Sequence, residues 1–572
     1  MPVENSENTF QERAEKLSLN ELKNWISLTD KDFQTVRKLL SNSTKLLIGP
    51  RGSGKSMLMR YAYYSCIEES QEVLPVYVNF ERYLHLEPLL HRTSNGNILF
   101  TKWVLAKIVV ESAQSLTDCG AFDAEEFNQI VSGVFLTNYS NLKLLAYQLE
   151  GGTKSDEEYL NNLSAVDISV GNVLEFLNRL IVLTNRRRLI LLMDDAAHAF
   201  SSNLQKEFFD VFRILKTKSI SAKAAVYPGL TSYSPYFNIG HDALFIESGY
   251  SPEEDGYIGF CDDLLLKRLG EESFSRLSAN RDGVIGLYYA SNGIPRGLIV
   301  MAEYILGEET PRKISKQDYF DAIDEWMDAV DKFHASLKTR LPRYTKFIDS
   351  GSELLQIVLD RVKEFNREKD IEKKAVYFGL SNPVPNEITR VINILEYAGL
   401  LTEKKDISKG NKGVFTRYLI HLGKVIQNNT LFEGHSKTLT YISQCLQNIK
   451  IKQFKRINPN SIFGKELADK CRFVLPPCQS CGTPRASEDA RFCTYCGAEL
   501  KSASIYFEII ERDISILPLS KDKIRRIKSG SKIMTIKDII MDENGVELKK
   551  VKGIKGYWAN KIRSIAEEFV GG

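Results

Sequence analysis

A glycine-rich segment near the N-terminus has the residue types and the spacing of a phosphate-binding loop. An apolar run at residues 46–48 leads into it, and a helical run at residues 57–64 follows it. In this setting the pattern G-x-x-x-x-G-K-[ST] wraps backbone amides around phosphate oxygens at a helix N-terminus, which favours negative charge. The loop consists of Gly49, Pro50, Arg51, Gly52, Ser53, Gly54, Lys55 and Ser56.

The last two loop residues carry the chemistry of this motif. We expect Lys55 to reach the β- and γ-phosphates and the Ser56 hydroxyl to ligate Mg²⁺. A structural loop that matches by chance is the alternative, but the full pattern seldom occurs by accident directly behind an apolar strand. ATP and Mg²⁺ are therefore the expected cofactors.

Two adjacent carboxylates follow a second apolar run. Residues 189–193 are all apolar, and Asp194 and Asp195 come directly after them. Behind a phosphate-binding loop, this is the Walker B arrangement, in which the strand ends beside the phosphates. Asp194 would hold Mg²⁺ through water, and Asp195 is the candidate base for the attacking water.

The elements around these motifs alternate between strands and helices. Such alternation predicts an α/β fold with a doubly wound parallel sheet, followed by a small helical lid. Residues 9–40 read as helices that pack on this domain, and residues 117–170 as a mostly helical insertion. The expected strands lie at residues 46–48, 73–80, 189–193, 222–227 and 243–247.

Four of the nine cysteines form two C-x-x-C-G knuckles separated by ten residues. This spacing predicts a zinc ribbon, in which four thiolates close a tetrahedral site with a structural and not a catalytic role. The other five cysteines are expected in the core. The zinc ligands would be Cys478, Cys481, Cys493 and Cys496.

Residues 341–430 read as three helices and then a hairpin, a pattern that resembles a winged helix-turn-helix. Residues 385–397 would be the recognition helix, and the hairpin tip is basic. A winged helix used for protein contact is the alternative. The expected DNA contacts are Asn386, Thr389, Arg390 and Asn393 to the major groove, with Lys404, Lys405, Lys409 and Lys412 to phosphates.

The C-terminal tail resembles a helix-hairpin-helix unit and, in layout, the C-terminal domain of the bacterial RNA polymerase α subunit. In that family, hairpin amides hold a phosphate. This chain carries Lys555 where the second hairpin glycine is expected, with Gly556 one place later. Lys552 and Lys555 would favour phosphate, whereas a structural or protein-docking tail is the alternative.

The front half resembles the AAA+ ATPases of the origin-recognition and cell-division-control initiator type, over about residues 30–310 and on into the winged helix. The resemblance rests on the loop, the paired aspartates, a polar residue after the fourth strand and a Gly-x-Pro-Arg lid. It implies Thr231, or Ser232, as the sensor near the γ-phosphate, and Arg296 as the lid arginine. Asp195 replaces the usual glutamate, and residues 231–242 lack the usual arginine finger, so hydrolysis is expected to be slow.

The chain has 572 residues, a net charge of +3, 43% apolar and 26% charged residues. These values indicate a globular protein of several domains, acidic in front and basic behind. Without a long apolar run or a signal segment, we expect it to be cytoplasmic, with no membrane partner. The expected parts are N-terminal helices (1–43), ATPase core (44–250), lid (251–310), winged helix (311–435), linker (436–475), zinc ribbon (476–502) and helix-hairpin-helix domain (503–572).

The expected function is ATP-controlled binding or remodelling of DNA, with ATP hydrolysis and a possible homo-oligomer on ATP binding. The alternative is a signalling or defence ATPase whose assembly is triggered by a protein or by foreign nucleic acid. A regulatory subunit that binds ATP without turnover is a third option. A protein partner could also bind through the C-terminal domains.

Overall fold

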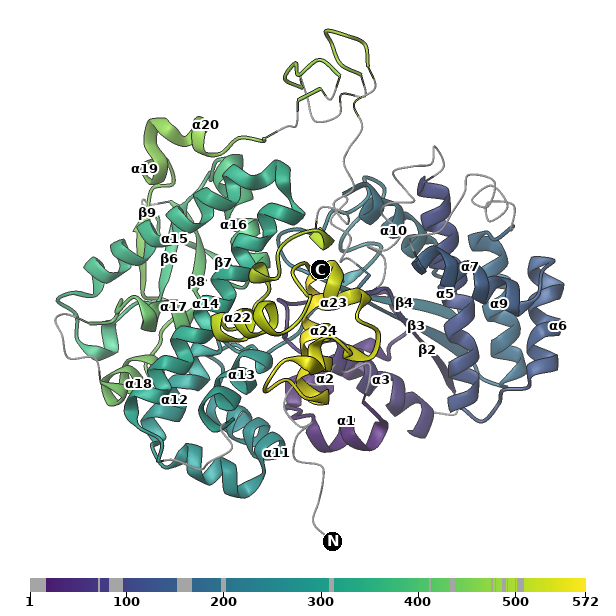
Figure 1. Ribbon diagram of the computed structural model, residues 1–572, viewed down its shortest axis with the longest axis horizontal. Helices are drawn as coiled ribbons and strands as arrows, with labels where there is room; N and C mark the ends of the chain where they lie inside the picture. The colour runs from purple at the N-terminus through teal and green to yellow at the C-terminus, as the bar shows by residue number, and fades with distance from the viewer. Residues whose placement is uncertain are drawn as a thin grey trace.

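A parallel sheet of five strands forms the centre of the front half of the chain (Figure 1). The computed structural model describes residues 17–69, 72–81, 96–151, 167–196, 202–307, 313–410, 413–432, 438–474, 477–478, 480–485, 490, 492–498, 500 and 509–571. The five strands are β1 (Lys45–Ile48), β2 (Val73–Asn79), β3 (Arg188–Asp194), β4 (Ile220–Val226) and β5 (Leu244–Glu247).

The strand order is β2-β3-β4-β1-β5, and every neighbouring pair is parallel. The α/β parallel-sheet prediction is confirmed. β4 lies between β1, which leads into the phosphate-binding loop, and β3, which ends in Asp194. The end of β4 therefore lies between the loop and the two aspartates. Ligands bind beyond the carboxyl ends of such strands, so all three lie at the edge of the sheet where a nucleotide is expected.

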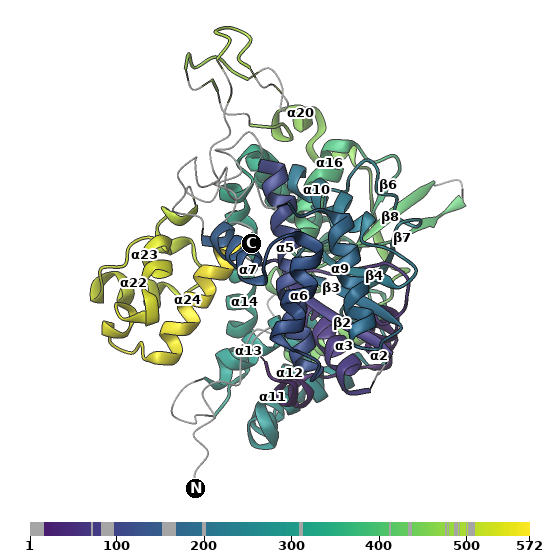
Figure 2. The same cartoon turned by 90° about the vertical axis from the view of Figure 1, so that its right-hand side faces the viewer.

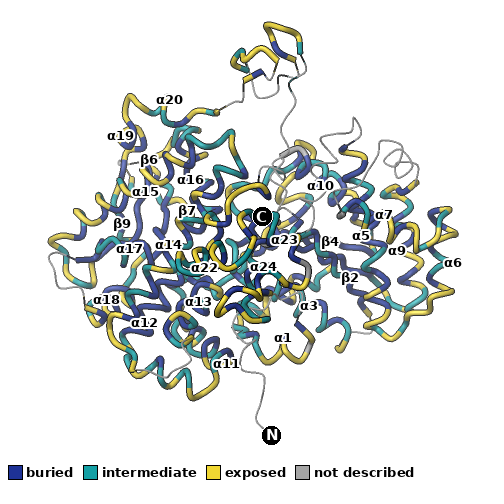
Figure 3. The backbone as a smooth tube through the Cα atoms, in the orientation of Figure 1, coloured by how far each residue is buried: buried dark blue, intermediate teal, exposed yellow. Residues whose placement is uncertain are grey.

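Helices cover both faces of the sheet because side chains alternate along each strand. Leu189 and Leu191 of β3 join a core on one face, whereas Ile190 and Leu192 join a separate core on the other. Figure 3 shows strands β2 and β4 of this sheet as mostly buried. The first face is covered by α5 (Gly96–Asp118), α9 (Val170–Leu183) and α10 (Ser202–Ile214), and the second by α2 (Asp30–Leu39) and α3 (Lys55–Glu69).

Further helices extend these two layers. α1 (Leu19–Trp25) packs on α3, as expected for the N-terminal helices. α6 (Ala124–Phe135) packs on α9, and α7 (Tyr139–Gly151) packs on α5. The insertion is therefore helical where it is described, as predicted. None of the described helices combines the length and apolar character needed to cross a membrane.

The helical lid follows β5. It consists of α11 (Tyr257–Ser278), α12 (Arg281–Ala290) and α13 (Pro295–Leu306), and Pro295 begins α13 at a position where a proline needs no N–H partner. Residues 291–294 form the turn between α12 and α13. The long helix α14 (Lys316–Arg340) packs on α12 and α13 and leads into the next domain.

A second sheet, of order β7-β8-β6-β9, defines that domain. The predicted hairpin is present, but residues 377–381 form a strand that sequence reasoning missed. The elements are α15 (Thr345–Asn366), β6 (Tyr377–Ser381), α16 (Asn386–Tyr397), β7 (Leu401–Ser408), β8 (Val414–Ile420) and α17 (Leu422–Gln427).

The interpretation of residues 436–475 as a linker is wrong. β9 (Phe454–Ile457) adds a strand parallel to β6, and α18 (Leu439–Gln447) packs on lid helix α12. Apolar side chains at both elements are buried, whereas the basic residues Lys450 and Lys452 lie between them. The segment is therefore part of the winged-helix domain.

The C-terminal tail lies beside α14 (Figure 2), and its buried apolar residues join the same core as the first face of the ATPase sheet. It contains α22 (Lys521–Gly530), α23 (Ile536–Met541) and α24 (Gly556–Gly571). The Lys561 ammonium on α24 forms an ion pair of 2.5 Å with Glu303 of the lid, and both side chains are mostly buried. Arg340 at the end of α14 is fully buried and donates to the Phe569 carbonyl. These contacts fix the tail on the lid and on α14.

Candidate nucleotide site and its neighbours

The phosphate-binding loop has the backbone that its glycines predict. Gly52 and Gly54 have φ values of 77° and 88°, which side chains disfavour. Lys55 is the first residue of α3, and its Nζ donates to the carbonyl oxygens of Gly49 (2.8 Å) and Pro50 (3.0 Å). The lysine therefore folds back onto its own loop and must leave these carbonyls to reach a phosphate.

Lys55 also lies on an aromatic ring. Its Nζ is 3.9 Å from the ring centroid of Tyr227, the residue directly after β4. The lysine is buried, and burial lowers its pKa to about 7, although the nearby carboxylates of Asp195 and Asp194 act in the opposite direction. Burial disfavours the charged ammonium, and the negative charge of bound phosphates would stabilise it.

Asp194 is fully buried at the end of β3. Its Oδ2 accepts a hydrogen bond of 2.7 Å from the Tyr77 hydroxyl on β2, and its Oδ1 accepts one of 3.0 Å from the Asp195 backbone N–H. These donors fix the carboxylate at the carboxyl edge of the sheet, the position expected for water-mediated Mg²⁺ binding. Tyr77 was missed in the sequence because strand β2 reads as apolar throughout.

Asp195 is held by a phenol. It has a φ of 52°, which is uncommon outside glycine, and its Oδ1 accepts a hydrogen bond of 3.0 Å from the Tyr227 hydroxyl. Tyr227 thus contacts both the loop lysine and the candidate base. Sequence reasoning missed it because the strand order, which places β4 between β1 and β3, cannot be read from the order of strands along the chain.

The lid reaches the loop through the turn before α13. A Cβ built on Gly52 would lie 2.9 Å from the Cβ of Arg296 and 3.1 Å from Ile294 Cγ2. Arg296 also lowers the pKa of Lys55 through its charge. The predicted lid arginine therefore lies beside the loop, together with Lys55 and the two aspartates.

The expected sensor, Thr231, forms hydrogen bonds within its own turn. Its hydroxyl donates to the Tyr227 carbonyl (2.7 Å) and accepts from the Tyr227 N–H (3.3 Å). The backbone N–H of Ser232 donates to Gln205. At the end of β4, the side chain that contacts Lys55 and Asp195 is thus that of Tyr227, and the hydroxyl of Thr231 stabilises the turn that follows.

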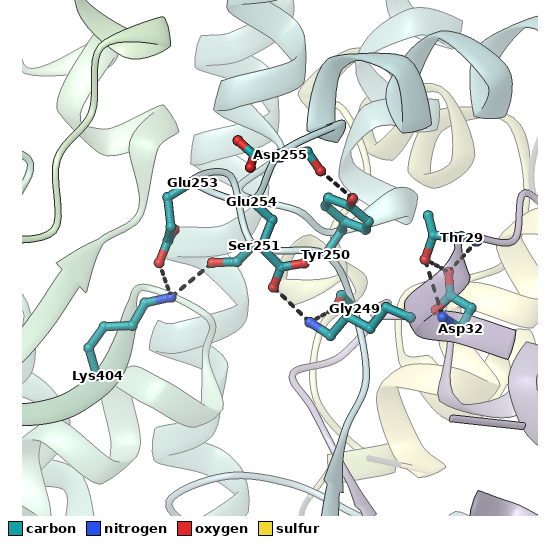
Figure 4. A network of polar contacts seen from close by, with 10 residues as sticks. Thr29, Asp32, Gly249, Tyr250, Ser251, Glu253, Glu254, Asp255 and Lys404 are labelled. Carbon is teal, nitrogen blue, oxygen red and sulfur yellow. Dashed lines mark hydrogen bonds and ion pairs between the residues drawn. The ribbon is translucent and has the colours of Figure 1, made fainter. Parts of the chain in front are cut away.

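The loop after β5 joins the nucleotide site to two other parts of the chain, and Figure 4 shows its contacts with Lys404. The Ser248 hydroxyl lies 2.8 Å from the Ser53 hydroxyl of the phosphate-binding loop. A few residues on, Glu253 forms an ion pair of 2.6 Å with Lys404 of β7, which also donates to Ser251 (2.8 Å). We call residues 248–256 the coupling loop.

The coupling loop also holds the N-terminal helices. Lys31 of α2 donates to the Gly249 carbonyl (3.1 Å) and pairs with Glu254 (2.8 Å). The prediction that Lys404 contacts DNA phosphate is wrong for this structure. Its side chain is 16% exposed and already paired with Glu253 of the coupling loop.

The recognition helix α16 is partly covered by the ATPase core. The backbone of Asn393 leaves no room for a Cβ on Gly229, in the loop after β4, so this turn of the helix packs on the core, and Asn393 is half-buried. Asn386 and Thr389 are exposed, and so is Arg390, whose guanidinium lies 5.0 Å from the Phe473 ring centroid.

In the wing, Lys405 is exposed and available to a ligand. Lys409 is half-buried and lies 5.5 Å from the Phe454 ring centroid. Lys412 lies outside the described residues. The wing therefore offers fewer free cations than its sequence suggests.

The four knuckle cysteines form one cluster. All four Sγ atoms lie within 4.8 Å of one another, and the Cys478–Cys496 and Cys481–Cys493 pairs are 3.6 Å apart. Tetrahedral zinc with bonds of about 2.3 Å needs sulfurs about 3.8 Å apart, so the site fits this ion. Among the described residues, this is the only such group of metal-binding side chains.

The backbone repeats around the two knuckles. In the first, Gly482 N–H donates to the Cys478 carbonyl (2.8 Å), and in the second, Gly497 N–H donates to the Cys493 carbonyl (2.9 Å). The remaining cysteines lie in or near the core, as expected: Cys66, Cys261, Cys445 and Cys471 are buried and Cys119 is half-buried.

The tail hairpin presents the two predicted lysines. Lys552 and Lys555 are exposed, and Gly553 between them has a φ of 86°. Arg526 of α22 lies beside this glycine, with Nη1 3.4 Å from a Cβ built on it. The hairpin precedes the N-terminus of α24, so the arrangement suits an anionic ligand.

Residues 9–282 match the family model named ORC-CDC6-like. No curated protein matches the chain. Among solved structures, the chain is similar to the Orc1 protein of Aeropyrum pernix in complex with DNA, at 14% identity, over 72% of this chain and 94% of that chain, with a TM-score of 0.28.

The family match and the site describe the same part of the chain. The matched residues include the phosphate-binding loop, both aspartates and the coupling loop, and they stop within lid helix α12. The stretch that is similar to the ORC-CDC6-like family, residues 9–282, is therefore the one that carries the candidate nucleotide site.

Proposed function

We propose that the protein binds and slowly hydrolyses ATP and that the bound nucleotide controls its contact with DNA. One observation carries this proposal. The coupling loop contacts the phosphate-binding loop through Ser248 and the winged helix through Glu253. A change at the phosphates can therefore reach the wing through the contacts of this one loop.

The residues at the site divide the chemistry among them. Lys55 would exchange its two loop carbonyls for phosphate oxygens, and Ser56 with Asp194 would hold Mg²⁺, which neutralises the developing charge on the phosphates. Arg296 would contact the γ-phosphate from the lid. Asp195 would take the proton of the attacking water once it leaves Tyr227.

Slow turnover fits this arrangement. Asp195 starts from a hydrogen bond to a buried phenol, and its carboxylate is one methylene shorter than the usual glutamate. No arginine occurs in residues 231–242. Since an arginine finger contributes about 10³-fold or more to turnover, the isolated protein is expected to release phosphate slowly.

DNA contact is supported by the exposed side chains of two domains. Asn386, Thr389 and Arg390 on α16 and Lys405 on the wing remain exposed, as do the hairpin lysines of the tail. Basic side chains on exposed surfaces neutralise phosphates and supply most of the affinity for nucleic acid.

A signalling ATPase remains the second candidate, and one observation favours it. Asn393 and Lys404, two of the residues expected on DNA, contact the ATPase core and the coupling loop instead. A winged helix that docks within its own chain could transmit the nucleotide state to a protein partner.

The experiment that tests the proposal compares nucleotide binding, phosphate release and DNA affinity in the wild type, Lys55→Ala and Asp195→Asn. Lys55→Ala should abolish nucleotide binding, and Asp195→Asn should bind ATP but not hydrolyse it. In the Asp195→Asn protein, DNA affinity should stay at its ATP value for as long as ATP is present. Wild-type turnover in either variant would contradict the assigned roles. A DNA affinity that is the same with and without nucleotide would favour the signalling candidate.

A further inference from the structure

We propose that a cleft between α14 and the tail helix α22 binds the phosphodiester backbone of nucleic acid. This inference rests on the proposed DNA-binding function and locates a site for it. The cleft has a volume of about 650 Å³ and lies where the tail packs against α14. Its polar lining consists of Lys332, Ser515, Lys521, Arg525, Lys528 and Ser529.

Four cations from two separate elements converge on this cleft. Lys521, Arg525 and Lys528 lie at positions i, i+4 and i+7 of α22, so they share one face of the helix. Lys332 reaches the same cleft from α14. The Ser515 and Ser529 side chains also line the cleft, and the Ser529 hydroxyl donates to the Arg526 carbonyl (3.3 Å).

The cleft is held in place by the contacts that dock the tail. Arg340, two turns beyond Lys332 on α14, donates to the Phe569 carbonyl of α24. Lys561 of α24 pairs with Glu303 of the lid. These buried contacts hold the tail, which carries the cations of α22, against α14 and the lid.

Two acidic residues face these cations, and they do not neutralise all of them. Asp522 pairs with Arg525 (2.6 Å), and Asp513 pairs with Lys528 (2.7 Å), which lowers the pKa of Asp513 to about 2. In the part of the chain that the structure describes, Lys332 and Lys521 have no ion-pair partner. The cleft therefore keeps an excess of positive charge.

A basic track continues from the cleft along the tail, which favours a nucleic-acid backbone over a single small anion. Arg526, the residue after Arg525, is exposed and lies beside Gly553 of the hairpin. Lys552 and Lys555 are exposed on either side of that glycine. Charges spaced along a surface match a polyanion whose phosphates repeat.

The test measures binding of a 30-base-pair DNA duplex to the full chain as a function of salt, with ADP present so that the phosphate-binding loop is occupied. The double variant Lys332→Gln, Lys521→Gln should lower the slope of log affinity against log salt by about 2, because each neutralised phosphate contributes about 0.9. Its affinity at low salt should fall about tenfold or more. Neither lysine contacts the nucleotide site, so ATP binding should not change.

The matched control is Lys216→Gln, Lys218→Gln, which removes two exposed lysines from the turn before β4. It should keep the wild-type slope. If the cleft variant also kept that slope while the wild type bound duplex, the cleft proposal would be overturned and the proposed function would stand. If the wild type showed no salt-dependent binding, both would fail.

A calorimetric titration with inorganic tripolyphosphate, again with ADP present, separates the two sources of phosphate. If the wild type binds tripolyphosphate, the cleft variant does not, and both bind duplex equally well, the cleft is a site for a small anion. This result would overturn the nucleic-acid proposal. Loss of duplex binding without tripolyphosphate uptake in the wild type would support it.

Discussion

The hydroxyl of Tyr227 donates a hydrogen bond of 3.0 Å to Oδ1 of Asp195, the candidate base for ATP hydrolysis. The ring of the same tyrosine lies 3.9 Å from the ammonium of Lys55. Tyr227 therefore connects the residue expected to bind the phosphates with the residue expected to activate water. In the structure, Lys55 and Asp195 thus share a contact with one side chain, that of Tyr227.

Removal of the Tyr227 hydroxyl should speed hydrolysis. Tyr227→Phe keeps the ring under Lys55 but frees Asp195 from a hydrogen bond to a charged group, worth about 1.5–3 kcal/mol. We expect phosphate release at saturating ATP to rise up to about tenfold, with little change in ATP affinity. Tyr233→Phe, in the same segment after β4, is the control and should behave as the wild type. Turnover that falls in Tyr227→Phe would mean that the phenol orients Asp195 for catalysis.

Nucleotide affinity should depend on the charge of Lys55. Its pKa is lowered to about 7 by burial, whereas the unfolded chain has the ordinary value near 10.5. Between pH 7 and 10.5 the unfolded chain therefore binds a proton at Lys55 that the folded protein lacks. For this reason the free energy of unfolding increases as the pH rises from 7. Bound phosphates favour the ammonium, so nucleotide binding takes up a proton there.

The affinity for Mg-ADP should accordingly weaken above pH 7, by up to tenfold per pH unit, in calorimetric titrations from pH 7 to 9. Lys223 of β4 is a matched control, because burial also lowers its pKa to about 7. Lys223→Met should retain the pH dependence. An affinity that is constant from pH 7 to 9 would show that Lys55 stays charged in the free protein.

The zinc site should be structurally separate from the ATPase. We expect one zinc ion per chain, and Cys478→Ser should lose it and unfold the ribbon locally, because the segment has almost no core of its own. Cys119→Ser, outside the cluster, should keep the metal. Elemental analysis and limited proteolysis measure both effects. Loss of ATP binding together with zinc would contradict this independence.

Two neighbouring lysines of the wing should separate coupling from DNA contact. Lys404 pairs with Glu253 of the coupling loop, whereas Lys405 is exposed. Lys404→Ala should reduce the effect of ATP on DNA affinity and leave the salt slope unchanged. Lys405→Ala should lower the salt slope by about 1 and keep the ATP effect. Identical behaviour of the two variants in DNA titrations would show that the coupling loop does not transmit the nucleotide state to the wing.

The sequence predicts best those elements whose signals are local. The phosphate-binding loop, the strand before Asp194, the lid turn before Pro295 and the cysteine knuckles each depend on a few adjacent residues, and the structure has them where expected. The role of Tyr227 could not be predicted in this way, because it depends on the insertion of β4 between β1 and β3.

The errors have a similar cause. Lys404 and Asn393 have suitable types and positions for DNA contact, but the packing of the winged helix against the core uses them within the chain. Residues 436–475 look like a linker because their buried residues fall in two short elements, and the pairing of β9 with β6 joins residues more than 70 positions apart. Such distant pairing leaves no pattern in either segment alone.

The most direct test of the account is the affinity of the full chain for a DNA duplex with ATP or with ADP, measured by fluorescence anisotropy at fixed salt. Allosteric coupling of about 1–3 kcal/mol predicts an affinity difference of about 5–150-fold between the two nucleotides, and no difference in Lys55→Ala. Equal affinities in the wild type with ATP and with ADP would contradict nucleotide control of DNA binding.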